Sequence, residues 1–244
     1  MATELVLAIS GGILMVAFLY SSVGHAGASG YIAVMTLFGL APIVIKPAAL
    51  VLNILVACLA TWQFWRAGHF SWRLFWPFAI TSVPCAFVGG YLNLPTDAFN
   101  IIVGVVLLYS AVRFFVQPKP DGEATLPKRP VAISIGAGLG LLSGLTGVGG
   151  GIFLTPLVIL MGWARTKTAS AVSALFILVN STSGLLGNIV STKQLPFFTL
   201  TFAAAAILGG LFGSFLGSQR FPPILIKRLL GIVLLIAGVK LILV

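Results

Sequence analysis

Acidic residues and cysteines are scarce in this chain. Of its 244 residues only 4 are Asp or Glu, charged residues of both signs make up 7%, and there are 2 cysteines. A soluble globular domain carries about 25% charged residues, so a water-soluble enzyme or nucleic-acid-binding protein is excluded. Cys58 and Cys85 lie in different apolar runs, which disfavours a disulfide framework or a zinc site.

Apolar residues make up 59% of the chain, and the mean hydropathy is +1.14. A membrane-spanning helix needs about 20 apolar residues, so the chain has room for roughly eight to ten segments. We therefore expect an all-α, multi-pass protein of a bacterial or archaeal plasma (inner) membrane. The apolar runs are 5–22, 29–45, 47–66, 72–92, 97–116, 131–145, 152–164, 168–190, 195–217 and 223–243.

The chain divides into two similar halves. A polar stretch separates a first membrane repeat, 1–116, from a second, 131–244, and the linker is 117–130. Five apolar runs lie in each half. Three glycines of the first half match three of the second at a constant offset of 123, namely Gly24, Gly27 and Gly39 with Gly147, Gly150 and Gly162. This spacing indicates an internal duplication.

The basic residues predict the topology. If each half crosses the bilayer an odd number of times, eleven of the 14 Lys and Arg face one side, and only Lys46, Lys193 and Lys240 face the other. Because basic loops stay in the cytoplasm, this bias predicts a cytoplasmic linker and outward-facing termini. An odd number also inverts the second half relative to the first, as in many secondary transporters. The inner set is Arg66, Arg73, Arg113, Lys119, Lys128, Arg129, Arg165, Lys167, Arg220, Lys227 and Arg228.

A glycine-rich turn joins the first two runs of each half. Irregular backbone at membrane depth is tolerated only where protein or a water-filled cavity surrounds it. Each turn leads into a helix whose free N–H groups and positive dipole end attract an anion. We therefore predict glycine-broken hairpins that meet near the midplane and bind a substrate there; the charge count leaves open whether they cross fully or re-enter. The predicted substrate-binding residues are Ser22, Gly24, His25, Gly27, Ala28, Ser29, Asn53, Thr146, Gly147, Gly149, Gly150, Gly151 and Asn180.

Several of these residues have a structural alternative. His25 titrates near neutral pH and is the candidate for carrying a coupled proton, but it could instead be a neutral histidine bonded to backbone. Asn53 and Asn180 could donate to the anion or only bond a neighbouring helix. Two glycine ladders, at 136, 140 and 144 and at 209, 213 and 217, favour close helix packing instead of a site.

The motifs beside the turns resemble those of the sulfite exporter TauE/SafE family. In the second half these are the stretch Thr146–Gly151, the Thr155-Pro156-Leu157 triplet, and the segments Ser173–Ile177 and Asn180-Ser181. In the first half, Val23–Tyr31 and Trp65–Phe70 look like the other repeat of the same family. The resemblance implies a membrane transporter of small sulfur-containing anions such as sulfite or organosulfonates.

The four acidic residues lie at the ends of the apolar runs or in loops, so no carboxylate is expected at the midplane to hold a cation. We therefore expect a secondary anion transporter, with an anion channel of the same architecture as the alternative. We expect no enzymatic activity, catalytic residue, metal or cofactor. The expected partners are a small anion and the lipid bilayer, with a homodimer as an alternative to a monomer and no nucleic acid.

Overall fold

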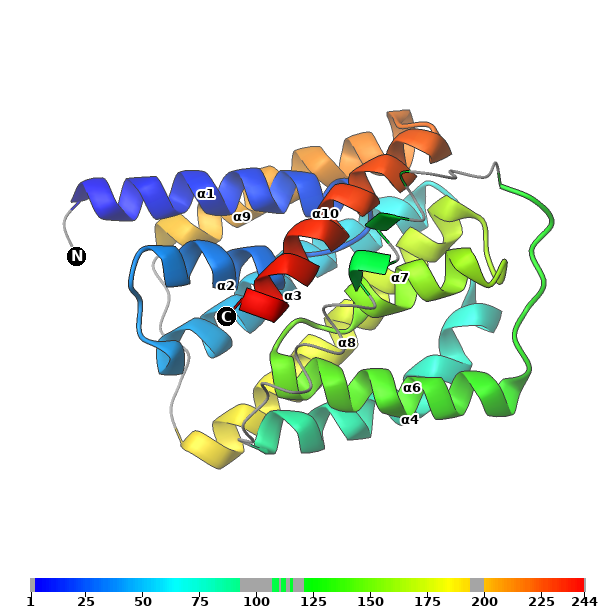
Figure 1. The fold of residues 1–244 in the computed structure, drawn as a ribbon, viewed down its shortest axis with the longest axis horizontal. Helices are drawn as coiled ribbons and strands as arrows, with labels where there is room; N and C mark the ends of the chain where they lie inside the picture. The colour runs from blue at the N-terminus through cyan, green and yellow to red at the C-terminus, as the bar shows by residue number, and fades with distance from the viewer. Residues whose placement is uncertain are drawn as a thin grey trace.

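The computed structural model describes residues 3–92, 107–109, 111–112, 115, 121–193 and 200–243. These residues form helices joined by short loops, and no strand occurs among them. The all-α prediction is therefore confirmed. The elements (Figure 1) are α1 (Thr3–Ser22), α2 (Ala28–Leu37), α3 (Pro42–Arg66), α4 (Trp72–Tyr91), α6 (Arg129–Thr146), α7 (Gly151–Leu160), α8 (Thr166–Thr192), α9 (Leu200–Phe215), η1 (Leu216–Arg220) and α10 (Pro223–Leu243).

Within the described ranges, 6 helices are long and apolar enough to cross a membrane. They are α1, α3, α4, α6, α8, and α9 together with η1. The predicted run 97–116 lies largely outside the described residues, and run 195–217 lies partly outside them. These six helices therefore support the multi-pass membrane protein that the hydropathy predicts.

Two expected boundaries differ from the observed ones. We expected a run at 29–45 and a new one from residue 47, but α2 ends at Leu37 and α3 already begins at Pro42. Gly39, with φ 74°, follows α2, and Pro42 begins the next helix, a position where its missing N–H costs nothing. Pro47 lies inside α3, because membrane helices tolerate internal proline.

Helices α2 and α7 are too short to cross a membrane. Each has 10 residues, which is about 15 Å of helix against a hydrocarbon core of about 30 Å. The turns before them are buried, from Ser21 to Ala28 and from Gly147 to Gly151. In Figure 1 both hairpins turn inside the molecule instead of at its ends. The short second arms and the buried turns therefore favour re-entrant hairpins over two full crossings.

The helices of one half pack mainly on those of the other. Helix α1 packs along α9, α4 packs along α6, and α3 crosses α8. Exchanging each helix for its counterpart, α1 for α6, α3 for α8 and α4 for α9, leaves these pairings unchanged. Counterpart helices also run in opposite directions in Figure 1.

Both glycine ladders lie in these interfaces. A Cβ at Gly136, Gly140 or Gly144 of α6 would meet the carbonyl of Phe78, Ser82 or Ala86 of α4. A Cβ at Gly209, Gly213 or Gly217 would likewise meet the carbonyl of Leu14, Phe18 or Ser22 of α1. The small residues let the two backbones approach closely. The prediction that the ladders serve packing is confirmed.

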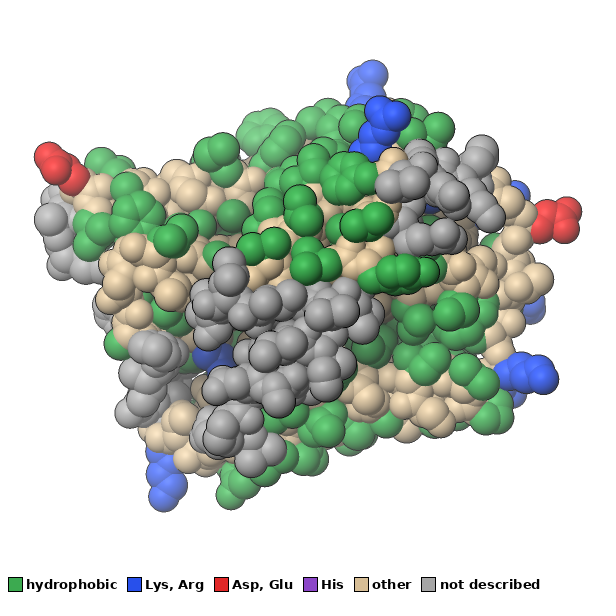
Figure 2. Space-filling view, viewed as in Figure 1, with side chains coloured by type: hydrophobic (Ala, Val, Ile, Leu, Met, Phe, Trp, Pro, Cys, Tyr) green, Lys and Arg blue, Asp and Glu red, His purple; other side chains and the backbone are tan. Residues whose placement is uncertain are grey.

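Basic residues gather at one end of the molecule. Among the described residues, Arg66 ends α3, Arg73 is near the start of α4, and Arg129 begins α6. In Figure 2 most of the visible blue side chains lie toward the end opposite the N-terminus. We call this the basic end. Arg113 and Lys119, which we also expected there, lie outside the described residues.

The linker is anchored at the basic end. The Asp121 carboxylate accepts hydrogen bonds from the Thr166 N–H (2.9 Å) and hydroxyl (2.6 Å) and pairs with the Lys227 ammonium at 2.7 Å. Burial opposes ionisation of Asp121, but the bonds from Lys227 and Thr166 outweigh it and hold its pKa below the ordinary value. One carboxylate thus joins the linker to the starts of α8 and α10.

Candidate functional site

Left-handed backbone at glycine shapes both buried turns. In the first turn φ is 80° at Gly24 and 106° at Gly27; in the second it is 83° at Gly149 and 76° at Gly150. Residues with a side chain rarely adopt these angles. Gly27 and Gly150 precede α2 and α7 as their N-caps. The predicted arrangement of a glycine turn followed by a helix start is therefore present in both halves.

Each turn contacts the third helix of the opposite half. A Cβ at Gly24 would meet Ser170 of α8, and a Cβ at Gly147 would lie 3.0 Å from Lys46 Cγ of α3. The Lys46 side chain, which the charge count assigns to the less basic side, lies against the second turn. The packing of the second turn on α3 is a tertiary contact, and the local pattern of apolar residues does not predict it.

Asn53 of α3 connects the two turns. Its Oδ1 accepts from the Ala28 N–H at 3.0 Å, at the start of α2. Its Nδ2 donates to the Val148 carbonyl at 3.3 Å, in the second turn, and to Ser181 Oγ at 3.0 Å. The side chain is fully buried. Of the two roles considered for Asn53, bonding to neighbouring elements is the one seen in this state.

Asn180 does not repeat this arrangement. Its Nδ2 donates to the Phe176 carbonyl of its own helix at 2.9 Å, and its Oδ1 has no hydrogen-bond partner in the described part of the chain. No hydrogen bond from the N–H of Gly149, Gly150 or Gly151 is found there either. At the start of α2 the Ala28 N–H is therefore bonded by Asn53, whereas no side chain bonds the corresponding N–H groups at the start of α7.

His25 reaches across to the second half. Its Nε2 lies 2.8 Å from Thr155 Oγ1 in α7. That hydroxyl also lies 2.7 Å from Ser173 Oγ of α8 and 3.0 Å from the Gly151 carbonyl. His25 Nδ1 has no partner among the described residues. The imidazole is therefore held at one nitrogen and available at the other.

Buried polar atoms without partners concentrate around the turns. Within the described ranges there are five such side-chain atoms, and three belong to residues that form or touch the turns. Most buried polar groups in proteins are hydrogen-bonded, so this concentration indicates a place where a polar ligand belongs. These three atoms are His25 Nδ1, Ser143 Oγ and Ser170 Oγ; a fourth, Asn180 Oδ1, lies on the same helix as Ser170.

A small cavity lies between the turns. Its volume is about 10 Å³, and it is lined by Tyr20, His25 to Ser29, Val148, Ile152 and Ile177. This is the space of a single water molecule, smaller than an oxyanion. The structure is therefore closed around the predicted site.

Comparison with known proteins identifies the family. A family model described as sulfite exporter TauE/SafE matches residues 9–241. This chain belongs to the sulfite exporter TauE/SafE family. It is 38% identical over 232 residues to "Probable membrane transporter protein y4hK" of Sinorhizobium fredii, covering 93% of this chain and 94% of that protein. It is 26% identical over 250 residues to "Probable membrane transporter protein YjnA" of Bacillus subtilis, covering 94% and 96%. No solved structure matches the chain.

This TauE/SafE family member is therefore an integral, multi-pass membrane transporter, as the sequence motifs predicted. Three residues predicted as ligands direct their hydroxyls elsewhere. Ser22 donates to the Leu19 carbonyl, Thr146 to the Leu142 carbonyl, and Ser29 bonds the Tyr20 hydroxyl at 3.0 Å. Their part in binding stays a prediction, since each already has a partner in this closed state.

Sequence reasoning missed several polar residues at the turns. Thr155, Ser173 and Ser181 bond His25 or Asn53 or each other, and Tyr31 donates to the Ala26 carbonyl at 2.5 Å. The first three belong to the motifs that carry the family resemblance, and this was the available signal. Ser143 and Ser170 carried no such signal, because a serine in an apolar helix most often bonds its own backbone.

Proposed function

We propose that this protein is a secondary transporter of small sulfur-containing anions, such as sulfite or an organosulfonate, and that it binds the anion between its two glycine turns. The description of the family supports the substrate class. The relatives' names support transport instead of catalysis.

The unpartnered polar atoms at the turns carry this proposal. Ser143 and Ser170 are 1% and 0% exposed, and neither hydroxyl has a partner in the part of the chain described. Leaving a buried polar group unpaired costs about 1–3 kcal/mol. An anion with several oxygens accepts hydrogen bonds from both hydroxyls and from the N–H groups before α7. Binding of the anion therefore removes the free-energy cost that the unpaired groups impose on the protein without substrate.

The electrostatics of the turns also suit an anion. The positive dipole end and free N–H groups of a helix start stabilise negative charge without an arginine. Lys46, near the start of α3, adds a cationic side chain beside Gly147. Neither turn contains an acidic residue.

The two hairpins supply a route to both membrane faces. The swapped helix pairings and the opposite directions of counterpart helices in Figure 1 support an inverted repeat. In such a fold one hairpin enters from each side, and the anion lies where they meet. Opening on one side at a time exposes the same site alternately to each compartment.

Two serine variants test the site. Ser143→Ala and Ser170→Ala should each weaken sulfite affinity by about tenfold or more, because each removes a hydrogen bond to a charged ligand. Neither should lower the melting temperature, since the hydroxyl removed has no protein partner. Ser134→Ala is the matched control, because Ser134 is exposed and bonds the Pro130 carbonyl of its own helix. The measurement is sulfite binding and uptake with purified protein in proteoliposomes.

Several results would overturn the proposal. Unchanged sulfite affinity in both folded serine variants places the anion elsewhere. Absence of uptake for both sulfite and taurine refutes the substrate class. Single-channel currents without saturation or exchange would show a pore in place of a carrier.

A further inference from the structure

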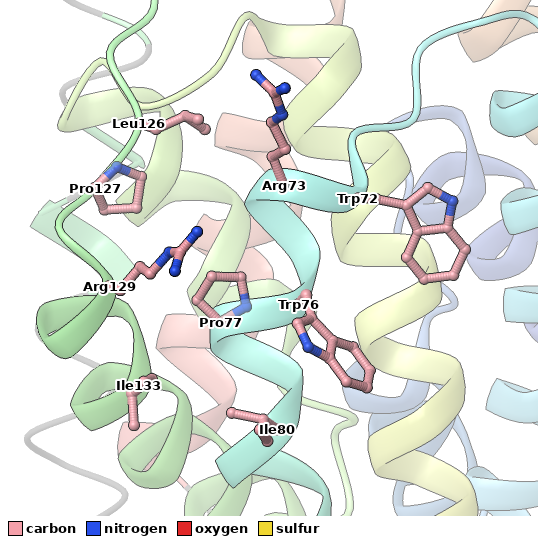
Figure 3. A pocket seen from close by; sticks show the side chains of 9 residues that line it. All are labelled: Trp72, Arg73, Trp76, Pro77, Ile80, Leu126, Pro127, Arg129 and Ile133. Atoms are coloured by element: carbon pink, nitrogen blue, oxygen red, sulfur yellow. The ribbon is translucent and has the colours of Figure 1, made fainter.

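A wide groove opens at the basic end, between α4 and α6. Its volume is about 830 Å³, and the last residues of the linker form one edge. Figure 3 shows that α4 contributes Arg73, Trp76 and Ile80, while Arg129 and Ile133 come from α6. Thr81 donates to the Ile133 carbonyl at 2.6 Å, which fixes the two walls to each other. None of the turn residues lines the groove.

Two arginines define the upper part of this groove. Arg73 and Arg129 are both exposed, and no hydrogen bond or ion pair joins either of them to the described part of the chain. No acidic residue lines the groove, and Asp121 of the linker already bonds Thr166 and Lys227. In Figure 3 the two guanidinium groups lie toward the same end of the groove, on its two walls, so both attract an anion that enters there.

The rest of the groove is apolar and aromatic. Trp76 and Ile80 are 59% and 53% exposed, and in Figure 3 Ile80 and Ile133 lie farther along the helices than the two guanidinium groups. Tryptophan prefers the depth of lipid headgroups, and basic pockets between membrane helices on the cytoplasmic side bind anionic headgroups. A free inorganic anion would use the arginines but gain nothing from the apolar wall.

We propose that this groove binds one anionic phospholipid, with its phosphate between Arg73 and Arg129 and an acyl chain along Ile80 and Ile133. The lipid sits where α4, α6 and the linker meet and links the two halves of the protein from outside. This site is separate from the anion site at the turns and does not depend on the proposed substrate.

Native mass spectrometry of the detergent-purified full chain tests this proposal. We expect one molecule of phosphatidylglycerol to be retained with at least about tenfold preference over phosphatidylcholine, because two arginines act on one headgroup. Arg73→Gln combined with Arg129→Gln should abolish this preference. Inorganic phosphate at millimolar concentration should not displace the lipid, since it lacks the acyl chain.

Matched controls separate the lipid site from general basicity. Arg220→Gln combined with Arg228→Gln removes the same charge from exposed residues of the basic end outside the groove and should leave the preference within about twofold. Arg73→Lys combined with Arg129→Lys keeps the charge, and should retain most of the binding if the groove is intact. Equal retention of both lipids by the native chain, an equal loss in both glutamine pairs, or full competition by phosphate would each overturn the proposal.

Quenching by brominated phosphatidylglycerol locates the bound lipid independently. Bromine on the acyl chain should quench fluorescence from Trp76, and Trp76→Phe should remove most of the difference from brominated phosphatidylcholine. Trp163→Phe is the control, because Trp163 packs on Phe78 at 6.2 Å between ring centroids and does not line the groove. If Trp163→Phe removes the difference and Trp76→Phe does not, the lipid lies elsewhere.

Discussion

At the scale of single residues, His25 joins the two halves through Thr155. Its Nε2 is 2.8 Å from the Thr155 hydroxyl, and its Nδ1 is unpartnered among the described residues. An imidazole fixed at one nitrogen and available at the other is suited to donate to an anion or to carry a proton. These two roles make different predictions.

A coupled proton on His25 predicts a specific phenotype for His25→Gln. Glutamine can keep the bond to Thr155 but does not titrate. Sulfite affinity should stay within about tenfold, since at most one hydrogen bond to the anion is lost, while uptake should no longer respond to a pH gradient. Proteoliposome uptake at imposed gradients measures this. Weaker binding with an intact pH response would make His25 an anion contact, and no change in either would make it structural.

Asp121 should make the stability of the protein depend on pH. Its pKa in the folded protein lies below the ordinary value, because the bonds from Lys227 and Thr166 outweigh burial. The stabilisation is therefore complete above the unfolded pKa, near pH 4, and is lost as the pH falls through the lower folded value. Asp121→Asn should lower the melting temperature at neutral pH and flatten its decline in acid.

Glu123→Gln is the control for this prediction. Glu123 is an exposed residue of the same linker, so its neutralisation should leave the melting curve almost unchanged. Equal melting temperatures for the Asp121 variant and the native chain at neutral pH would show that the linker anchor adds no stability.

At the scale of elements, the turn before α7 combines left-handed backbone with close packing. Gly150 and Gly162 have similar φ, 76° and 67°. A Cβ at Gly150 would lie 2.9 Å from the Phe176 ring and 3.2 Å from Ser143 Cβ, whereas nothing lies within 4 Å of one at Gly162. Alanine substitutions at these two positions therefore distinguish the effect of backbone strain from the effect of obstructing the site.

We expect Gly150→Ala and Gly162→Ala each to lose about 1–2 kcal/mol through backbone strain, and Gly150→Ala to lose more in total because its methyl group also displaces Phe176 and Ser143. Only Gly150→Ala should also reduce sulfite affinity, by about tenfold or more, because its methyl group displaces Ser143 from the proposed anion. Thermal melting and sulfite binding measure the two effects. Equal affinity in the two variants would mean that the second turn does not contact the anion.

At the scale of the whole molecule, the basic end and the swapped helix pairings predict one orientation in the membrane. Basic residues between membrane segments remain in the cytoplasm, so the linker should be cytoplasmic and both termini periplasmic. Reporter fusions within the linker and at Val244 test this. A cytoplasmic C-terminus would remove the argument for an inverted repeat.

The sequence alone determined the class of the protein and predicted its division into halves. Hydropathy, composition and glycine spacing are properties of the chain itself, so they indicated the membrane helices, the duplication, and the ladders at Gly140 and Gly213. The family resemblance also rested on local motifs at the turns. Each of these signals can be read within one segment or by comparing two segments.

Only the tertiary structure decided how those segments meet. It showed that both turns are buried inside the molecule, that Lys46 lies against Gly147, and that Asn53 bonds both turns while Asn180 leaves an oxygen unpaired. These contacts join residues about a hundred positions apart, such as Asn53 and Val148. The packing of distant helices determines which buried polar atoms find partners, and no local pattern of residue types records that packing.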